Sequence, residues 1–250
     1  MQQSLVSIIV PTLNEEKHIT QLLTSIKRQS YSRIEIIIVD GGSKDKTLDI
    51  ANGFGAMVKI IDKLGEFESR NIGAKLAKGK ILIQTCADIV FPEKVVERVV
   101  DSFLKNKKLV GLTGPGIPIN PPYWGKLEYI IYNKTRLLAS KFKIFSTSTN
   151  FLACKKNVFE EIAGFRRNDV NADGLFGREL SKRGEIKFDS STYVHISSRR
   201  LWEMGFLRFN LLFLYVLENF IPFLSSSNSF NERKVKAKQR HHKLHENLQV

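Results

Sequence analysis

The residues best suited to chemistry lie in three short polar segments, residues 11–15, 40–45 and 85–88, and each follows an apolar run. Asp40 is followed by two glycines, which allow the backbone to turn sharply and to approach a ligand closely. An aspartate at such a turn can accept hydrogen bonds from a nucleobase N–H or a ribose hydroxyl. The chain carries neither GxGxxG after its first apolar run nor GxxxxGK[ST] anywhere, which argues against dinucleotide binding and excludes a P-loop.

Alternating strand and helix patterns must position these segments. Short apolar runs predict four strands, and apolar residues at helical spacing predict a helix after each of them. The predicted strands are 5–10, 34–40, 56–61 and 80–84, and the predicted helices are 15–29, 44–52, 67–78 and 92–106. This alternation is typical of an α/β fold with a parallel sheet and right-handed crossovers. Because ligands bind beyond the carboxyl ends of such strands, we expect the three polar segments to lie together.

The pattern becomes less regular after residue 110. Residues 111–122 are rich in Gly and Pro and are expected to form a loop. The elements predicted beyond it are a helix over 127–142, a strand over 146–156, helices over 158–162 and 173–183, and short strands over 186–188 and 192–196. A chain of 250 residues, 42% of them hydrophobic, can build a sizeable core. The two cysteines, Cys86 and Cys154, have no metal-type spacing and indicate a reduced, cytoplasmic setting.

Five segments occur in one order over residues 5–200. They read SIIVPTLNEEKHI, IEIIIVDGGSKDKT, ESRNIGAKLAKGKILIQTCAD, FLACKKNVFEEIAGF and ADGLFGREL. Together they resemble the family 2 glycosyltransferases, which have the GT-A fold. The resemblance implies a Rossmann-like, mostly parallel sheet with helices on both faces, in a domain over 1–200 with a nucleotide-sugar half (1–110) and an acceptor half (111–200). It also implies a nucleotide-sugar donor, a divalent metal ion and inversion at the sugar carbon.

The resemblance assigns the donor to residues of the strand-end segments. Thr12 and Asp40 match the family's positions that hold the nucleobase and the ribose, and their neighbours Pro11 and Gly41 belong to the same segments. Arg70, in the SRN triplet, matches a basic residue near the donor. We therefore expect these five residues to form part of the donor site.

The family's metal-binding triplet, Asp-x-Asp, reads Cys86-Ala87-Asp88 in this chain. Asp88 keeps the carboxylate that holds the metal in the family, whereas the position that usually faces the ribose is a thiol. Because Mg²⁺ and Mn²⁺ prefer oxygen ligands, we expect Asp88 to hold one of these ions with the two donor phosphates, and Cys86 and Ala87 to lie beside the donor. Cys86 could instead be a small half-buried filler or a ligand of a thiol-loving metal. His195 is either a metal ligand or phosphate contact, as in some relatives, or a structural residue.

The chemistry requires a base opposite the departing diphosphate. A sugar leaving a diphosphate passes through a cation-like centre, and a carboxylate on the opposite face takes the proton of the acceptor hydroxyl. The family's base lies in a Glu-Asp pair shortly before a helix with Arg, and the resemblance matches this pattern to Ala172, Asp173 and Arg178. Asp173 is therefore the expected base. Asp169 is the competing candidate, and Asp173 could also be only a helix N-cap.

The chain carries a formal net charge of +14, and its C-terminal part combines apolar and basic residues. Residues 205–224 are apolar on nearly all sides, and a basic segment over 233–243 follows an SSSNS linker. We expect residues 201–250 to form a hydrophobic or amphipathic helix lying on a membrane, with a basic tail attracted to anionic headgroups. A helix buried against the domain or a dimer partner, and a membrane span, are the alternatives. Because no signal peptide precedes the first strand, we expect a cytoplasmic protein peripheral on the inner face of the cell membrane.

The predicted function is transfer of a sugar from a nucleotide-diphosphate donor to a lipid-linked or glycan acceptor at that membrane surface. Cys86 and Ala172 stand where the family has carboxylates, and this leaves a second hypothesis open. The chain could be a protein that binds nucleotide sugars or glycans, or a scaffold protein, and that no longer catalyses transfer. Binding of nucleic acid by the basic tail is not expected, because no stacking aromatic follows Phe230.

Overall fold

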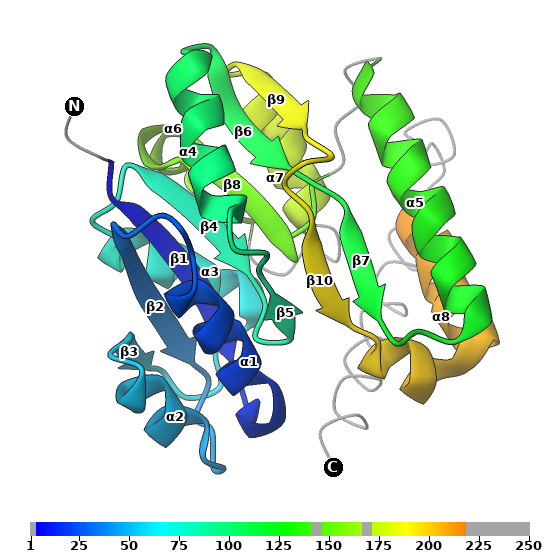
Figure 1. Ribbon diagram of the computed structural model, residues 1–250, viewed down its shortest axis with the longest axis horizontal. Coiled ribbons are helices and arrows are strands. Elements are labelled where there is room, and N and C mark those ends of the chain that lie inside the picture. The colour runs from blue at the N-terminus through cyan, green and yellow to red at the C-terminus, as the bar shows by residue number, and fades with distance from the viewer. Residues whose placement is uncertain (1–3, 142–146, 167–171, 219–250) are drawn as a thin grey trace, which may run out of the picture.

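A seven-stranded sheet covered by helices on both faces forms the centre of the computed structural model (Figure 1). The structure describes residues 4–141, 147–166 and 172–218. The strand order is β3 (Met57–Ile60), β2 (Ile34–Asp40), β1 (Val6–Thr12), β4 (Ile81–Thr85), β8 (Phe151–Lys155), β6 (Leu109–Thr113) and β9 (Glu185–Phe188). Neighbouring strands run parallel except at β8, which pairs antiparallel with β4 and β6. The predicted α/β fold with a mostly parallel sheet is confirmed.

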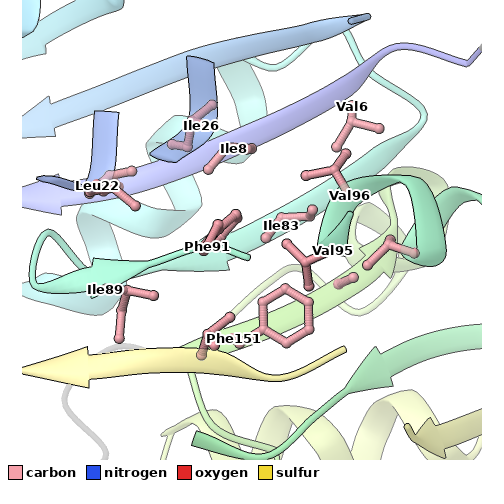
Figure 2. Close-up of a cluster of buried hydrophobic side chains, with 14 of the residues drawn as sticks. Val6, Ile8, Leu22, Ile26, Ile83, Ile89, Phe91, Val95, Val96 and Phe151 are labelled. Atoms are coloured by element: carbon pink, nitrogen blue, oxygen red, sulfur yellow. The ribbon is translucent and has the colours of Figure 1, made fainter. Parts of the chain in front are cut away.

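Helices pack against the sheet in two layers, and this double cover explains the unbroken apolar runs of the strands. Apolar side chains of α1 and α4 pack on one face, and those of α3, α6 and α7 pack on the other. Along β1, Ile8 points to the first layer and Ile9 to the second. Figure 2 shows the first layer, where Ile8 and Ile83 of the sheet cluster with Leu22 of α1. The helices are α1 (Glu16–Lys27), α2 (Thr47–Gly53), α3 (Glu66–Leu76), α4 (Val95–Lys105), α6 (Lys156–Glu161) and α7 (Ala172–Ser181).

The strands and helices predicted before residue 110 are confirmed, with ends shifted by no more than three residues. The loop predicted over 111–122 is wrong, because these residues complete β6 and form an edge strand, β7. The second sheet that contains it has the order β5 (Ile89–Val90), β10 (Val194–Ser197) and β7 (Gly116–Ile119). A Cβ on Gly114 would lie 2.2 Å from the carbonyl oxygen of Thr192, so that glycine is required for close strand packing rather than for a loop. Pro118 is tolerated because β7 lies at a sheet edge, where an absent N–H breaks no necessary ladder bond.

Two further helices, α5 (Tyr123–Lys141) and α8 (Arg199–Glu218), lie side by side beyond the second sheet (Figure 1). The ring of Trp124 on α5 packs against Phe206 at 5.6 Å and Phe209 at 6.0 Å between centroids. Gly205 interrupts α8 with a positive φ of 66°, a conformation that glycine adopts without strain.

The part of the predicted apolar helix 205–224 that the structure describes lies in α8. This helix begins earlier than predicted, at Arg199. Residues 219–224 and the basic segment 233–243 lie outside the described residues. Within the described part of the chain, no helix combines the length and the apolar character needed to cross a bilayer.

Candidate active site

The carboxyl ends of β1 and β2 bring the first two polar segments together. Thr12 and Asp40 are paired residues at these strand ends, and Thr12 Oγ1 donates a 2.7 Å hydrogen bond to Asp40 Oδ2. The loops that follow are also joined, because Asn14 N–H donates to Ser43 Oγ at 2.8 Å. The two segments therefore lie side by side, as predicted.

Asp40 is fully buried, and its carboxylate accepts four hydrogen bonds from the protein. Besides the Thr12 hydroxyl, the donors are Gly42 N–H at 2.9 Å, Ser43 N–H at 2.7 Å and the Ser43 hydroxyl at 2.6 Å. A carboxylate offers about four lone-pair positions, so these bonds fill it. In this conformation Asp40 fixes the turn after β2. A direct hydrogen bond from a nucleoside to Asp40 stays a prediction. It requires one of the present hydrogen bonds, such as that from the Ser43 hydroxyl, to break.

The turn after β2 depends on glycine. Gly42 has a φ of 98°, and a Cβ there would lie 2.2 Å from Asp62 Oδ1. Gly41 N–H donates to the carbonyl oxygen of Thr12 at 2.9 Å, and Pro11 lies within the β1 ladder. Since neither Gly41 nor Pro11 carries a polar side chain, each can contact a bound nucleotide sugar only through its backbone or through apolar atoms.

Arg70 lies inside the protein, behind the third polar segment. Its side chain is fully buried, and Nη1 donates to the carbonyl oxygen of Thr85 at 2.8 Å. Nη2 donates to Glu66 Oε1 at 2.8 Å and to Cys86 Sγ at 3.2 Å. Arg70 therefore supports the Cys86-Ala87-Asp88 segment from within, through α3 and the end of β4.

The thiol of Cys86 is held among polar neighbours but stays neutral. Burial raises the pKa of Cys86 to about 12, although the nearby Arg70 opposes the rise. The thiol faces the carbonyl oxygen of Thr149 at 3.8 Å and Asn150 Oδ1 at 3.6 Å. Because metals bind the thiolate rather than the thiol, this environment does not favour a thiol-loving metal.

Thr149 joins this cluster to Asp173. The N–H of Thr149 donates to Asp173 Oδ2 at 3.4 Å, while its carbonyl accepts from Cys86. Asp173 lies in the first turn of α7 rather than before the helix, and its Oδ1 accepts from Gly174 N–H at 2.9 Å. Burial raises the pKa of Asp173 above its usual range, and the two N–H donors oppose the rise. A carboxylate with a raised pKa is a stronger proton acceptor.

Arg199, the first residue of α8, bridges the segments that follow β1 and β4. Its Nη1 and Nη2 donate to the two carboxylate oxygens of Glu15 at 3.0 and 2.8 Å, and its Nε lies 3.3 Å from Asp88 Oδ2. Ser197 N–H donates to the carbonyl oxygen of Asp88 at 3.0 Å, which fixes the backbone of that segment. Asp88 thus meets a cation supplied by the protein itself.

Asp88 fits a divalent cation whose ligand set is completed by a bound substrate. Its side chain is 10% exposed, and the guanidinium at Oδ2 marks a position where positive charge is accommodated. Across residues 4–141, 147–166 and 172–218 there is no group of three or more His, Cys, Asp or Glu suited to a metal. One carboxylate with phosphate oxygens and water suits Mg²⁺, which keeps several waters and rarely occupies an all-protein cage.

The remaining predicted site residues are His195, Ala87 and Asp169. His195 is paired with Val90 on β5, and its ring packs edge-on against Tyr193 at 5.5 Å, so a role as metal ligand stays a prediction. Ala87 is buried in the hydrophobic core. Asp169, the competing base, lies outside the described residues.

Sequence reasoning missed three residues of the site, Glu15, Glu66 and Thr149. Glu15 lies in the PTLNEE segment, three residues after Thr12, so its place in that segment was a usable signal. Glu66 precedes Arg70 by four residues on α3, the spacing of a helical ion pair. The bridging role of Thr149 has no local signal, because both its partners come from distant parts of the chain.

The chain matches the family model described as Glycosyl transferase family 2 over residues 7–163. It is 27% identical over 191 residues to Glycosyltransferase AglE of Haloferax volcanii, an alignment that covers 72% of this chain and 59% of that protein. It is 40% identical over 94 residues to the PGL/p-HBAD biosynthesis glycosyltransferase of Mycobacterium bovis, covering 35% of this chain and 37% of that one. The chain therefore spans less than two thirds of the length of either relative.

Two solved structures share its architecture. The mannosyltransferase PcManGT of Pyrobaculum calidifontis, in complex with GDP-Man and Mn²⁺, superposes with a TM-score of 0.66 at 19% identity over 98% of this chain and 76% of its own. TarS 1-349 of S. aureus, in complex with UDP-GlcNAc, gives a TM-score of 0.63 at 21% identity over 78% and 59%. At these identities the likeness establishes a common fold.

Proposed function

The chain belongs to glycosyl transferase family 2, and on this premise we propose that it transfers a sugar from a nucleotide-diphosphate donor to the hydroxyl of a lipid-linked or glycan acceptor, with inversion. The observation that carries the proposal is the link through Thr149. Asp173, from the second half of the chain, is bonded to the residue that also contacts Cys86 of the Cys86-Ala87-Asp88 segment. The proposed proton acceptor is thereby joined to the segment that carries Asp88, the proposed cation ligand.

Asp173 is the general base of this proposal. The acceptor oxygen forms a bond to the sugar carbon while the bond from that carbon to the diphosphate oxygen breaks, and the acceptor proton passes to the Asp173 carboxylate. Attack on the face opposite the departing diphosphate inverts the configuration at the carbon. The N–H donors of Gly174 and Thr149 hold the carboxylate in place, and burial raises its pKa, which suits a proton acceptor.

Asp88 would hold Mg²⁺ or Mn²⁺ together with oxygens of the donor diphosphate, and the ion would offset the negative charge on the departing group. The protein's part is to release Asp88 from Arg199. Because Arg199 keeps two hydrogen bonds to Glu15, its guanidinium would stay beside the anionic leaving group after that release.

The donor's nucleoside would lie at the ends of β1 and β2. In this proposal the donor contacts come from Pro11, Thr12, Asp40, Gly41 and Cys86, while the buried Arg70 and Ala87 support that edge of the sheet from inside the protein. The complexes of PcManGT with GDP-Man and Mn²⁺ and of TarS with UDP-GlcNAc support a nucleotide-sugar donor and a divalent ion as a class. Since those two donors differ in both nucleobase and sugar, they support no single donor for this chain. The proposed setting is the inner face of the cell membrane.

A thermal-shift screen of the full chain tests the donor assignment. UDP-, GDP- and TDP-sugars are compared with and without Mn²⁺, and we expect one nucleotide series to raise Tm, more strongly with the metal. A ligand at a hundred times its Kd stabilises by about 2.7 kcal/mol, which a shift assay detects readily. Absence of any shift across the panel would contradict the donor assignment.

The donor found in that screen is then used in transfer assays with lipid-linked and soluble glycan acceptors. We expect a product with inverted anomeric configuration, read by NMR. Binding without transfer to any acceptor would favour the non-catalytic sugar-binding alternative, and a product with retained configuration would remove Asp173 as base.

A further inference from the structure

We propose that the outer face of α5, together with β7 and the described part of α8, is a surface that lies on an anionic lipid bilayer. The inference adds a contact surface to the membrane setting of the proposed function and does not depend on its chemistry. We call this surface the α5 face. Its exposed apolar residues are Ile117, Ile119, Tyr123, Leu127, Ile130, Ile131, Leu137, Leu138, Trp202, Phe206, Leu207 and Leu211.

The side of α5 that faces the protein carries two polar side chains, Asn133 and Arg136, that bond to neighbouring strands. Asn133 accepts from the N–H of Gly116 at 3.3 Å and donates to its carbonyl oxygen at 2.8 Å. Arg136 is buried, donates to Thr113 Oγ1 at 3.0 Å and lies over the ring of Phe188 at 5.1 Å. A helix that covers a domain normally buries its apolar stripe. Here polar contacts attach α5 to β6 and β7 and leave the apolar stripe outside.

The outer side of α5 repeats apolar residues at helical spacing. Tyr123 is 88% exposed, Ile131 54% and Leu138 56%. Fifteen large apolar side chains are exposed in the described residues, and the twelve of the α5 face comprise two on β7, six on α5 and four on α8. Scattered exposed apolar residues need no explanation, but such a concentration on neighbouring elements marks an interaction surface.

Charge indicates which partner fits. The exposed positions of α5, all described by the structure, include Lys126, Lys134 and Lys141 among the apolar residues and no carboxylate. A helix with apolar residues and interspersed lysines on its exposed side suits the interface of an anionic bilayer, where lysines contact headgroups. Trp202 and Tyr123, amphipathic aromatics, suit the headgroup level of the same interface.

The other candidate occupants fit the charge less well. A second copy of the chain applied through the same face would bring the lysines of both copies together, which is unfavourable. Residues 219–250 contain six Lys or Arg and two Glu, so that segment carries like charge and does not complement the α5 face. Both the segment and the face complement an anionic surface.

The experiment measures binding of the full chain to vesicles of phosphatidylglycerol and phosphatidylcholine, with pure phosphatidylcholine vesicles for comparison. The double variant Ile131→Glu/Leu138→Glu should bind the anionic vesicles at least about tenfold more weakly. The control is Leu104→Glu on α4, whose side chain is 53% exposed and therefore matched to Ile131 and Leu138. It should bind as the unmodified chain does. Since all three side chains are exposed, the variants should keep their Tm.

A second variant tests the electrostatic part of the inference. Changing Lys126, Lys134 and Lys141 to Gln should weaken binding to anionic vesicles by about fivefold per lysine and leave the weak binding to phosphatidylcholine unchanged.

Unchanged vesicle binding by the Glu double variant would overturn the inference and assign the membrane affinity to other residues. Loss of a dimer, seen by analytical ultracentrifugation, with vesicle binding intact would assign the face to a second copy. The donor thermal shift of the same variants is independent of both outcomes. A chain that binds vesicles through the α5 face but binds no nucleotide sugar would refute the proposed function alone.

Discussion

Asp173→Asn should separate catalysis from folding. An asparagine keeps one carbonyl oxygen, which can still accept from Gly174 N–H, the shorter of the two bonds at 2.9 Å. Its amide nitrogen would face the Thr149 N–H, so the weaker 3.4 Å bond is lost. One such bond is worth about 1 kcal/mol. A general base contributes about 10²- to 10⁴-fold to a rate, and we expect transfer to fall by that factor.

Electrostatics offsets the lost bond. Burial raises the pKa of Asp173, so folding disfavours the ionised form of this carboxyl and favours the protonated form. The stabilising contribution of the group is present below its unfolded pKa of about 3.9 and is lost as pH rises through its folded pKa. As pH rises through that folded pKa, the wild-type chain therefore acquires a destabilising charge that asparagine does not carry. We expect a Tm change within about 4 °C in either direction at pH 7, and a difference between variant and wild type that shifts in favour of the variant from pH 4 to pH 7.

The assay follows transfer rate, donor-induced thermal shift and Tm for Asp173→Asn and for Asp101→Asn. Asp101 is an exposed carboxylate on α4 with only a 3.9 Å ion pair to Lys105, so its variant controls for loss of one negative charge. Full transfer rate with normal donor binding would refute the base assignment. A Tm loss of more than about 8 °C would show that the residue is structural, and the activity data would then not report on catalysis.

Three further outcomes follow from the geometry. Removal of divalent metal with EDTA should stop transfer, and Asp88→Asn should abolish the Mn²⁺-dependent part of the donor thermal shift; activity that survives EDTA would contradict the metal role. Cys86→Asp places a carboxylate where a thiol now lies 3.2 Å from Arg70, and we expect donor binding about tenfold tighter by calorimetry; an unchanged Kd would leave Cys86 as a packing residue. Gly73→Ala should destabilise by about 1–2 kcal/mol because its Cβ would meet Ile9 at 2.4 Å. Gly53→Ala, with nothing within 4 Å, is the control, and equal Tm values for the two variants would contradict this packing argument.

The central strands were predictable because their cause is local. A strand buried on both faces is apolar at most positions, and β2, with five consecutive buried residues, coincides with its predicted range for that reason. The carboxyl ends of β1 and β2 were predictable with it, since parallel neighbours bring Thr12 and Asp40 to one edge. The topology thus follows from patterns that extend over a few residues.

The residues that the sequence did not predict depend on contacts between distant segments. Gly114 and Pro118 suggested a loop, but each is accommodated by a neighbour or an edge that only the folded chain supplies. Arg199 lies 184 residues from Glu15, and no local pattern relates them. The periodicity of residues 127–142 predicts α5 correctly, yet periodicity alone would assign its apolar stripe to the core. Asn133 and Arg136 reverse that orientation through their contacts with β6 and β7.

The helix α8 connects the two proposals physically. Its first residue, Arg199, bonds Glu15 and approaches Asp88, and within one turn the indole N–H of Trp202 donates to the carbonyl oxygen of Asn120 at 3.1 Å. Trp202, before the kink at Gly205, already belongs to the α5 face. At about 1.5 Å per residue, the three residues of helix from Arg199 to Trp202 rise only about 5 Å. If both proposals hold, the α5 face rests on the bilayer only a short distance from Asp88. A lipid-linked acceptor would then present its hydroxyl from the headgroup layer, which favours such an acceptor over a soluble glycan.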